Sequence, residues 1–439
     1  MAGEWKETTL GECAAWLSGG TPFKGNEAFW SGPIPWVSAK DMKSFRLYDA
    51  EDHISPLAVG NGGKLVPAGT ILLLVRGMTL HNDVPICMVT REMAFNQDIK
   101  ALRPAKNVDG AFLAYWLLAN KPKLLASVDH AGHGTGRLVT DTLKEKPVLL
   151  PPLAEQRAIA AALGALDDKI ELNRRMNATL EAMARALFQS WFVDFDPVRA
   201  KLDGRPPAAL DPATAALFPD SFQESETGHI PKGWEVKTLS DLTSLITKGT
   251  TPTQDDMTGA PDSDAQINYV RVNSIDEDGS VLGDKLTKIP ESVHEGVLKR
   301  SILIANDVLY TIAGTIGRIA LAEDWLLPAN TNQAVAIIRP EPEIPPGFLM
   351  LTMGHEVFRE ELHNNIVHAV QANLSLGMLS KARVVVPPPA VLPQLFRPID
   401  ALLSQISANR AQSRTLATLR DALLPMLLSG ELSVAQKQN

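Results

Sequence analysis

The sequence contains very little cysteine. Its 439 residues include only Cys13 and Cys87, which lie far apart and form neither a Cys-x-x-Cys motif nor a Cys/His cluster. Residue count and spacing therefore exclude a disulfide scaffold and a structural zinc site of the usual kind. A chain without disulfides is typical of the cytoplasm, which we expect as its location.

The sequence also lacks long hydrophobic runs. Although 45% of the residues are hydrophobic, no apolar stretch reaches the roughly 18 residues needed to span a bilayer. Met1 is not followed by a basic and then apolar leader, so we expect neither a membrane span nor secretion. The length and the apolar content instead predict two or three packed domains.

A basic excess is missing as well. The net charge is −8, and segments 1–150, 151–233, 234–389 and 390–439 carry net charges of +1, −3, −8 and +2. None of these segments has the cationic surplus of a protein that holds DNA by charge alone. Any binding of DNA is therefore expected to depend on local patches and on help from other subunits.

Catalytic motifs are absent from the sequence. It contains no Ser-His-Asp signature, no His-Glu-x-x-His, no Walker pair and no Asn/Asp-Pro-Pro-Tyr/Phe motif of an amino-methyltransferase. The pairs His130/His133 and His363/His368 have no constellation of carboxylates or cysteines around them, so no metal site is predicted. The chain is therefore expected to be a recognition subunit and not an enzyme.

What the sequence does contain is an internal repeat at a shift of 236 residues. Residues 95–104 ("FNQDIKALRP") align with residues 331–340 ("TNQAVAIIRP"), and the same shift aligns Arg137 with Asn373 and Asn173 with Asn409. Upstream, the segment from Trp5 resembles the segment from Trp234 after a small slip. A period this long indicates a duplicated domain, because solenoid repeats have periods of about 20 to 50 residues.

A long helix is predicted after the first copy of the repeat. Apolar residues in steps of four and three form an unbroken heptad seam between Pro152 and Pro197. The seam consists of Ile159, Leu163, Leu166, Ile170, Asn173, Asn177, Leu180, Ala184, Leu187 and Trp191. A helix over residues 154–191 would be about 57 Å long. Asp194 and Asp196 before Pro197 are interpreted as stop signals.

A second seam follows the second copy and has the same character. It consists of Ile399, Leu402, Ile406, Asn409, Ser413, Leu416, Leu423 and Leu427. We predict that the two helices pair with each other antiparallel, and that Asn173, Asn177, Asn409 and Ser413 fix one register. Such a pair would place the two globular copies at opposite ends of a rod. An ordinary amphipathic core helix with tolerated polar residues is the alternative.

The predicted fold class is α+β. Two similar mixed α/β domains are separated by two long antiparallel coiled-coil helices, as the product of an internal duplication. Runs such as "TILLLV" from Thr70 and "DVLYTI" from Asp307 indicate strands, and "AFLAYWLLAN" and "FLMLTMGHEVFREEL" indicate helices. The expected boundaries are a first recognition domain at 1–150, a central helix at 151–196, a Pro-rich surface linker at 197–233, a second domain at 234–389 and a C-terminal helix at 390–439.

Polar loops of the two domains are the candidate contacts to DNA. "GMTLH" (77–81) and "GTIGR" (314–318) follow apolar strands at matched positions, where base-reading side chains would differ between the copies. "HAGHGTGR" (130–137) lacks the spacing of a P-loop, and it is either a backbone and arginine contact to phosphate or a plain turn. Hairpin turns are the alternative for the other two loops. The candidate residues are Arg76, His81 and Arg137 in the first domain and Lys248, Arg271, Asn273, Arg318 and Asn373 in the second.

Over its full length the chain resembles the DNA specificity subunit of type I restriction-modification systems. The matching stretches are "PPLAEQRAIAAALGALDDKIELNRR", "ALFQSWFVDFDPV", "LFPDSFQESETGHIPKGWEVKTLSDL" and "LLPMLLSGEL". The resemblance implies two target recognition domains, each reading half of a bipartite site, joined by two antiparallel helices. One departure is "PPPAVLPQL" from Pro387, where the first copy has "PPLAEQRAI". We expect this departure to loosen the start of the second helix.

The resemblance also implies partners. The helices would bind modification (methyltransferase) subunits, expected to be two, which hold S-adenosylmethionine. The motor and nuclease activities, which use ATP and magnesium, would belong to a restriction subunit. This chain itself is expected to hold no cofactor and to bind double-stranded DNA but no membrane. A divergent DNA endonuclease and a non-catalytic coiled-coil adaptor are the alternatives, and neither the recognised bases nor the spacer length follow from one sequence.

Overall fold

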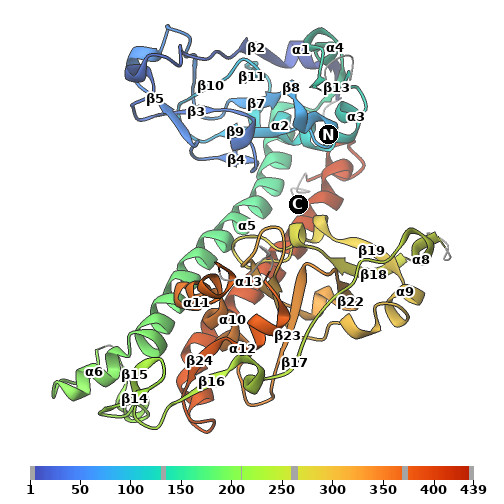
Figure 1. Cartoon of the computed structure of the whole chain (residues 1–439). Helices are drawn as coiled ribbons and strands as arrows, with labels where there is room; N and C mark the ends of the chain where they lie inside the picture. Colours follow the sequence, from blue (N-terminus) through green and yellow to red (C-terminus); the bar gives the residue numbers. More distant parts are fainter. Residues whose placement is uncertain (1–4, 130–134, 209, 259–264, 368–373, 435–439) are drawn as a thin grey trace, which may run out of the picture. The chain divides into compact units, whose positions relative to one another are not determined.

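The computed structural model describes residues 5–129, 135–208, 210–258, 265–367 and 374–434 (Figure 1). The chain divides into two units: residues 1–174 with 410–439, and residues 175–409. Two long helices, α5 (Leu153–Phe188) and α13 (Leu392–Leu428), each contribute one segment to each unit.

The first unit is built on a five-stranded sheet of order β2-β11-β7-β9-β4. Its strands are β2 (Ala14–Ser18), β4 (Arg46–Leu47), β7 (Ile71–Leu74), β9 (Ile86–Val89) and β11 (Ile99–Pro104). β11 pairs antiparallel with both β2 and β7. All four residues of β7 are buried, as expected for a central strand that is covered on both faces.

A second sheet of the first unit has the order β5-β3-β10-β6. It is formed by β3 (Ile34–Val37), β5 (Asp52–Ile54), β6 (Leu65–Val66) and β10 (Met93–Phe95), and β3 and β10 run parallel. Two strand pairs complete the unit, β1 (Lys6–Thr9) with β13 (Pro147–Leu150) and β8 (Arg76–Gly77) with β12 (Gly136–Arg137). The short helices are α1 (Leu10–Cys13), α2 (Gly110–Ala119), α3 (Lys121–Leu125) and α4 (Thr140–Lys144).

The second unit repeats this strand pairing. Its sheets have the orders β17-β23-β20-β21 and β19-β18-β22, and β16 pairs with β24 as β1 pairs with β13. The strands are β16 (Glu235–Thr238), β17 (Thr243–Lys248), β18 (Ala265–Val270), β19 (Thr287–Pro290), β20 (Val308–Thr311), β21 (Ile319–Leu321), β22 (Ala329–Thr331), β23 (Val335–Pro340) and β24 (Arg383–Val386). β18 and β22 are parallel, like β3 and β10. The repeat in the sequence is therefore a repeat of topology.

The second unit contains five short helices after β17 in the described residues, two of which share one predicted helical stretch. They are α8 (Gln254–Thr258), α9 (Glu291–Glu295), α10 (Pro346–Gly354), α11 (Glu356–Val367) and α12 (Leu376–Lys381). The stretch "FLMLTMGHEVFREEL", which is predicted to be helical, forms two helices, α10 and α11. The break follows Gly354, a residue with low helix propensity, and His355 has extended backbone angles.

The segment between the two copies is more structured than its composition indicates. It contains α6 (Asp196–Leu202), α7 (Pro212–Ala216) and a hairpin of β14 (Phe222–Ser225) and β15 (Gly228–Pro231). Val198, Phe218 and Ile230 are buried in the core of the second unit. These apolar residues stand singly among proline and aspartate, so they produce no periodic pattern in the sequence.

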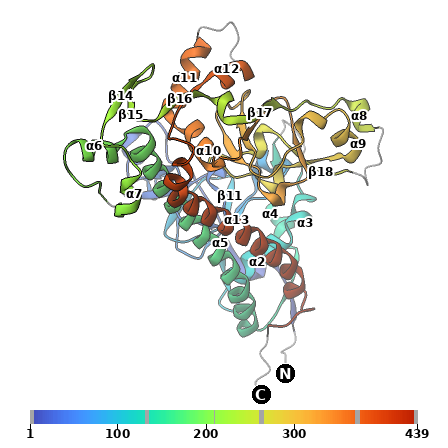
Figure 2. The ribbon, with the colours of Figure 1, turned by 90° about the horizontal axis from the view of Figure 1, so that it is seen from below.

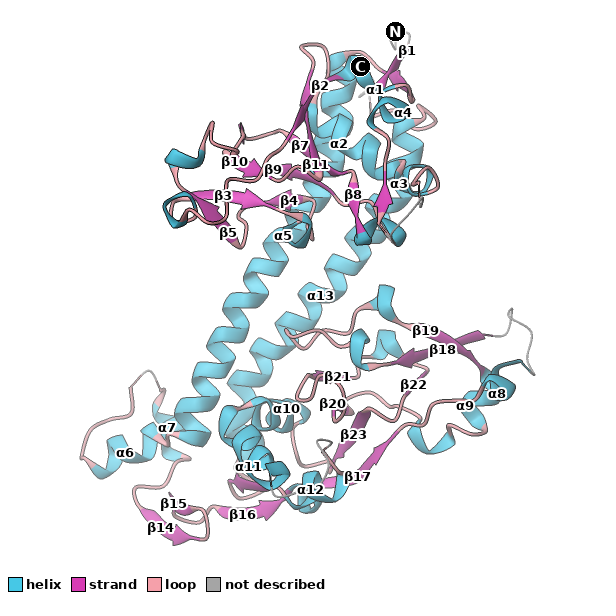
Figure 3. Ribbon diagram, turned by 45° about the horizontal axis from the view of Figure 1, so that its top comes forward, coloured by secondary structure: helices cyan, strands magenta, loops and turns pink. Residues whose placement is uncertain are grey.

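The long helices follow the heptad pattern. Every predicted seam residue of both helices is buried or half-buried, and within each unit the α5 and α13 segments lie side by side (Figures 2 and 3). α5 passes into a π-turn, Gln189–Val193, before it ends. α13 begins at Leu392, three residues after the position that matches Leu153. The proline-rich "PPPAVLPQL" therefore delays the second helix, and Pro393 stands in its first turn, where an N–H is not required.

Candidate nucleic-acid interface and helix pair

At one end of the main sheet of each unit, three neighbouring strands begin or end and continue into loops. In the first unit, β2 ends at Ser18, β7 ends at Leu74 and β11 begins at Ile99, and the register pairs Lys100 with Ser18 and Ile99 with Leu74. In the second unit, β17 ends at Lys248, and Lys248 pairs with Ala336 near the start of β23. We call this end of the strands the loop end of each sheet.

The fold brings two predicted arginines together next to the loop end of the first unit. Arg76 and Arg137 are direct cross-strand partners on the β8–β12 ribbon, and both side chains are exposed. A Cβ on Gly136 would lie 2.8 Å from the Leu80 side chain, so glycine permits the ribbon to pack closely against the turn Met78–His81. His81, a third predicted residue, ends that turn and is exposed.

The charges on this ribbon favour an anionic ligand. Like charges directly opposite each other on paired strands are destabilising, and an anion beside Arg76 and Arg137 would relieve that repulsion. Asp129 lies on the far side of Arg137, to which it is joined by two backbone hydrogen bonds of 2.8 and 3.0 Å. The three paired positions therefore carry one carboxylate and two guanidinium groups, and Asp129 neighbours only Arg137. This is a local cationic patch of the kind expected in a chain without an overall basic excess.

The candidates of the second unit are placed differently from one another. Lys248 and Asn273 are exposed, whereas Arg271 and Arg318 are half-buried. The Arg318 guanidinium donates from Nη1 to the carbonyl oxygen of Ile275 at 2.8 Å, and its Nη2 lies 3.6 Å from the Glu277 carboxylate. Arg318 thus braces the turn after β18, and a contact between Arg318 and DNA stays a prediction. Asn373 lies outside the described residues, as do the loop residues His130 and His133 and the histidine His368.

The predicted register residues contact one another across the helix pair. In the first unit, Asn173 is fully buried and donates to Gln412 Oε1 at 2.9 Å and to Ser413 Oγ at 3.2 Å. In the second unit, Asn409 donates to Asn177 Oδ1 at 2.8 Å, and Asn177 donates to the Ile406 carbonyl at 3.4 Å. Residues later in α5 contact residues earlier in α13, so the paired segments run antiparallel. The shift of 236 residues maps the Asn173–Ser413 pair onto the Asn409–Asn177 pair.

A polar cluster in the first unit joins its domain to both helices. The Tyr115 hydroxyl of α2 donates to Asp167 Oδ2 at 2.6 Å, and Arg420 Nη1 of α13 lies 2.7 Å from Asp167 Oδ1. Asp168, next on α5, forms an ion pair with Arg46 of β4. Burial, and then the hydrogen bond to Asp167, raise the pKa of Tyr115, which therefore stays a neutral donor. Burial lowers the pKa of Arg420, but the hydrogen bond and charge of Asp167 outweigh it and keep the guanidinium charged.

Sequence reasoning did not find this cluster. Arg420 interrupts the predicted seam between Leu416 and Leu423, and that interruption was the available signal. The positions in the second copy that match Tyr115, Asp167 and Arg420 are Leu351, Leu403 and Ala184, which belong to the apolar core of the second unit. The two domains therefore rest on their helix segments through different chemistry.

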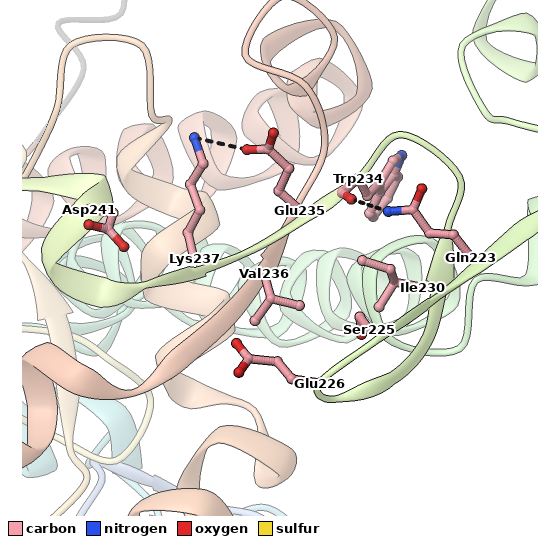
Figure 4. Close-up of a pocket in the computed structure, with 9 residues that line it drawn as sticks. All are labelled: Gln223, Ser225, Glu226, Ile230, Trp234, Glu235, Val236, Lys237 and Asp241. Atoms are coloured by element: carbon pink, nitrogen blue, oxygen red, sulfur yellow. Dashed lines mark hydrogen bonds and ion pairs between the residues drawn. The ribbon is translucent and has the colours of Figure 1, made fainter.

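A surface pocket of about 600 Å³ lies in the second unit, between the β14–β15 hairpin and β16 (Figure 4). Gln223 donates to the Trp234 carbonyl at 2.8 Å, and Lys237 lies 3.4 Å from Glu235. Glu226 and Asp241 also line it, and no predicted site residue does. Its acidic lining does not suit a nucleic acid.

Two further features are absent from the described residues. These residues contain no group of three or more His, Cys, Asp or Glu side chains arranged to hold a metal ion. None of the helices formed by these residues is both long enough and apolar enough to cross a membrane.

Comparison with known proteins identifies the repeat. The family model described as the type I restriction modification DNA specificity domain matches residues 2–182 and again residues 231–410. The chain belongs to this family. Each match covers one globular copy and at least the first half of the helix that follows it, so the predicted family and the duplication are confirmed.

Relatives in the specificity family match along nearly the whole chain. The HindI specificity subunit of Haemophilus influenzae is 24% identical over 478 residues, covering 98% of this chain and 100% of that protein. The MjaIX specificity subunit of Methanocaldococcus jannaschii is 24% identical over 445 residues, covering 99% and 94%. The crystal structure of the S subunit of a type I restriction-modification system from M. genitalium matches with a TM-score of 0.55 at 14% identity, covering 97% and 96%. This likeness confirms the predicted fold class.

Proposed function

We propose that this chain is the sequence-specific DNA-recognition subunit of a type I restriction-modification complex. In this proposal each domain reads one half of a bipartite site in double-stranded DNA. The observation that carries it is the repeated sheet, whose loop end has the same scaffold in both units but different polar side chains. The loop at 77–81 (GMTLH) of the first unit, for example, is matched by the loop at 314–318 (GTIGR) of the second. Side chains that differ on a common scaffold are what reading two different half-sites requires.

The helices are the proposed docking surface for modification subunits. Besides the buried seam, α5 exposes Met176 and Met183, and α13 exposes Leu419 and Met426, with 37 to 48% of each residue accessible. Apolar side chains spaced seven residues apart on a helix face suit packing against further helices. Met183 and Leu419 are matched by the shift of 236 residues, which supports two equivalent sites and hence two modification subunits.

In this proposal the chain is non-catalytic. S-adenosylmethionine belongs to the modification subunits, and ATP and magnesium to the restriction subunits. A divergent endonuclease, the first alternative, would cleave DNA as an isolated chain with magnesium. A coiled-coil adaptor, the second, would show no sequence-selective binding of a duplex, alone or with partners. The described residues contain no helix that could span a membrane, and a cytoplasmic location is part of the proposal.

The proposal is tested by mapping methylated bases in a host that carries the complete operon. Methylation should fall on one bipartite sequence. Exchange of residues 1–150 for those of another specificity subunit should then change one half-site and leave the other half-site and the spacer unaltered. A change in both half-sites would contradict independent reading by two domains. Loss of all methylation would be assigned to misfolding only if the chimaera failed to copurify with modification subunits.

A further inference from the structure

The loop end of each sheet carries an exposed glutamine that is held in one orientation. Thr21 donates its hydroxyl proton to Gln97 Oε1 in the first unit, and Thr251 donates to Gln333 Oε1 in the second. Both glutamines are exposed. Because the carbonyl oxygen of each amide faces its threonine, the two N–H donors of Nε2 point away from it. Among the described residues, no protein acceptor takes these N–H groups from either glutamine.

The backbone around each glutamine is built in the same way in both units. Asn96 Oδ1 accepts from the N–H of Asp98 at 3.0 Å, and Asn332 Oδ1 accepts from the N–H of Ala334 at 3.2 Å. Each asparagine therefore closes a tight turn around the glutamine that follows it. The N–H of Asn96 also bonds to Val37, and that of Asn332 to Val270, so that the turn is tied to the second sheet.

The loop segment that carries each threonine, just after β2 or β17, is also held by hydrogen bonds. Trp36 donates its indole N–H to the Gly20 carbonyl at 3.0 Å, and the Tyr269 hydroxyl donates to the Thr250 carbonyl at 2.8 Å. A Cβ on Gly19 or on Gly249 would overlap a carbonyl oxygen of the neighbouring strand. Glycine therefore lets the threonine approach the glutamine in both copies. An exposed side chain that is fixed by this many bonds is preorganised for a ligand.

A lysine accompanies the glutamine in each unit, but it comes from different strands. Lys100 is three residues after Gln97 on β11 and pairs across the sheet with Ser18 of β2. In the second unit, the residue three after Gln333 is Ala336, and its cross-strand partner on β17 is Lys248. The matched cross-strand pair therefore contains one lysine in each unit. In the first unit the lysine is on β11, and in the second unit it is on β17, the counterpart of β2. A positive charge is thus present at this position in both units, although the two residue pairs are different.

We propose that Thr21, Gln97 and Lys100, and likewise Thr251, Gln333 and Lys248, form one DNA-phosphate anchor in each domain. The inference rests on the proposed function and adds that different residues contact the phosphates and the bases. Features shared by both domains cannot distinguish unequal half-sites, so they suit the sugar-phosphate backbone, which is alike at every site. Amide N–H groups and an ammonium are donors suited to phosphate oxygens. Residues that differ between the copies, such as those of the loops 77–81 and 314–318, are left to read bases.

The test uses the full chain copurified with its modification subunits. Binding is measured to a short duplex carrying the sequence found by methylation mapping and to a scrambled duplex. Gln97→Glu and Gln333→Glu keep the size of the side chain and an acceptor for the threonine, but place a negative charge at the anchor. We expect each to lower affinity about tenfold, as for loss of a hydrogen bond to a charged group. The loss should be equal for both duplexes, with the methylated sequence unchanged.

Two further measurements separate a phosphate contact from other roles. Lys100→Ala and Lys248→Ala should each reduce the dependence of log affinity on log salt by about one. Lys106→Ala, an exposed lysine beyond the other end of β11, is the matched control and should leave the slope unchanged. Replacing the contacted phosphate by a neutral methylphosphonate should weaken binding of the wild-type complex and remove the difference between it and the Gln97→Glu complex.

Three outcomes would overturn the anchor. A change of preferred bases on substitution of Gln97 or Gln333 would make them base readers. Unaltered affinity of both glutamate variants would make the Thr–Gln pairs a scaffold of the turn only. Unaltered salt dependence of both lysine variants would show that Lys100 and Lys248 do not contact phosphate. Failure of the proposed function is distinguishable, because the wild-type complex would then bind the two duplexes equally.

Discussion

Asn177 of α5 and Asn409 of α13 face each other inside the second unit, and Asn409 Nδ2 donates to Asn177 Oδ1 at 2.8 Å. Only 8% and 5% of these residues are exposed. A buried amide pair costs stability relative to leucine but disfavours registers in which the two amides do not meet. Under the repeat, this pair corresponds to Asn173 and Ser413 in the first unit. The helix pair thus has two repeat-related polar layers.

The first prediction follows from this pairing. Asn177→Leu alone should lower the free energy of unfolding by about 1 to 3 kcal/mol, because it removes Asn177 Oδ1, the acceptor of the buried Asn409 Nδ2. The double substitution Asn177→Leu/Asn409→Leu should recover that loss and permit slipped registers. Urea unfolding measures the first effect. Disulfide trapping between cysteines introduced at Leu180 and Ile406 measures the second.

The chain suits this cross-linking experiment. Burial raises the pKa of Cys13 to about 11 and that of Cys87 to about 12, so neither native thiol forms thiolate readily near neutral pH. Thr179→Leu, at an exposed position of α5, is the matched control for added apolar surface. A single register with undiminished cross-linking in the double variant would mean that the asparagines have another role.

The second prediction concerns the Tyr115–Asp167–Arg420 cluster. Arg420→Ala leaves Asp167, whose side chain is 10% exposed, without its ion-pair partner. It should destabilise the first unit by about 2 kcal/mol, less than for a fully buried pair because Arg420 is partly exposed. Asp167→Leu combined with Arg420→Ala installs the residue types found at the matched positions Leu403 and Ala184. That double variant should be more stable than Arg420→Ala alone, as measured by urea unfolding. Equal stability of the two variants would show that the cluster contributes no coupled interaction.

The pattern of the fold was accessible from the sequence because its determinants are local or repeated. The heptad seam depends on spacing alone, and each predicted seam residue proved buried or half-buried. The duplication required only that the chain be compared with itself. Matched runs such as residues 95–104 and 331–340 became β10–β11 and β22–β23, which pair alike in the two units.

Side-chain partners were not accessible in the same way. Arg420 reads as an interruption of the seam, and its partner Asp167 is 253 residues away in the sequence. Arg318 was placed correctly in a loop, but the direction of its guanidinium depends on how the turn at Ile275 packs. Gln97 and Gln333 are matched by the repeat in the sequence. Their shared orientation toward a threonine required the register of the strands.

The third prediction separates two arginines that sequence reasoning treated alike. Arg137→Ala should lower DNA affinity and reduce its salt dependence by about one, because an exposed cation on the β8–β12 ribbon is lost. Arg318→Ala should instead lower the free energy of unfolding by about 1 kcal/mol, since it removes the hydrogen bond to the Ile275 carbonyl. Filter binding over a salt series and urea unfolding, applied to both variants, decide the matter. If the Arg318→Ala protein were as stable as the wild type but bound DNA more weakly, Arg318 would be a DNA contact and not a structural residue.

The last prediction is that helix length sets the spacer between half-sites, and the register decides where to lengthen the helices. Asn177 faces Asn409 and Asn173 faces Ser413, so Leu180 stands opposite Ile406. A heptad inserted after Leu180 is therefore matched by one inserted before Ile406. Insertion after Leu416, the repeat-matched position, would instead lie opposite Ile170 and put the Asn173–Ser413 layer out of register.

Seven residues added to each helix lengthen the pair by about 10.5 Å. On B-DNA, where 10 to 10.5 base pairs span about 34 to 36 Å, this equals roughly three base pairs and a rotation of about 100° around the duplex. We expect weakened activity with an optimal spacer about three base pairs longer, because the rotation must be absorbed by the supercoil and the domain connections. A heptad in only one helix should disrupt pairing and abolish methylation. Methylation of a plasmid library with varied spacers measures the optimum, and an unchanged optimum in the double-insertion variant would show that the helices do not set the spacing.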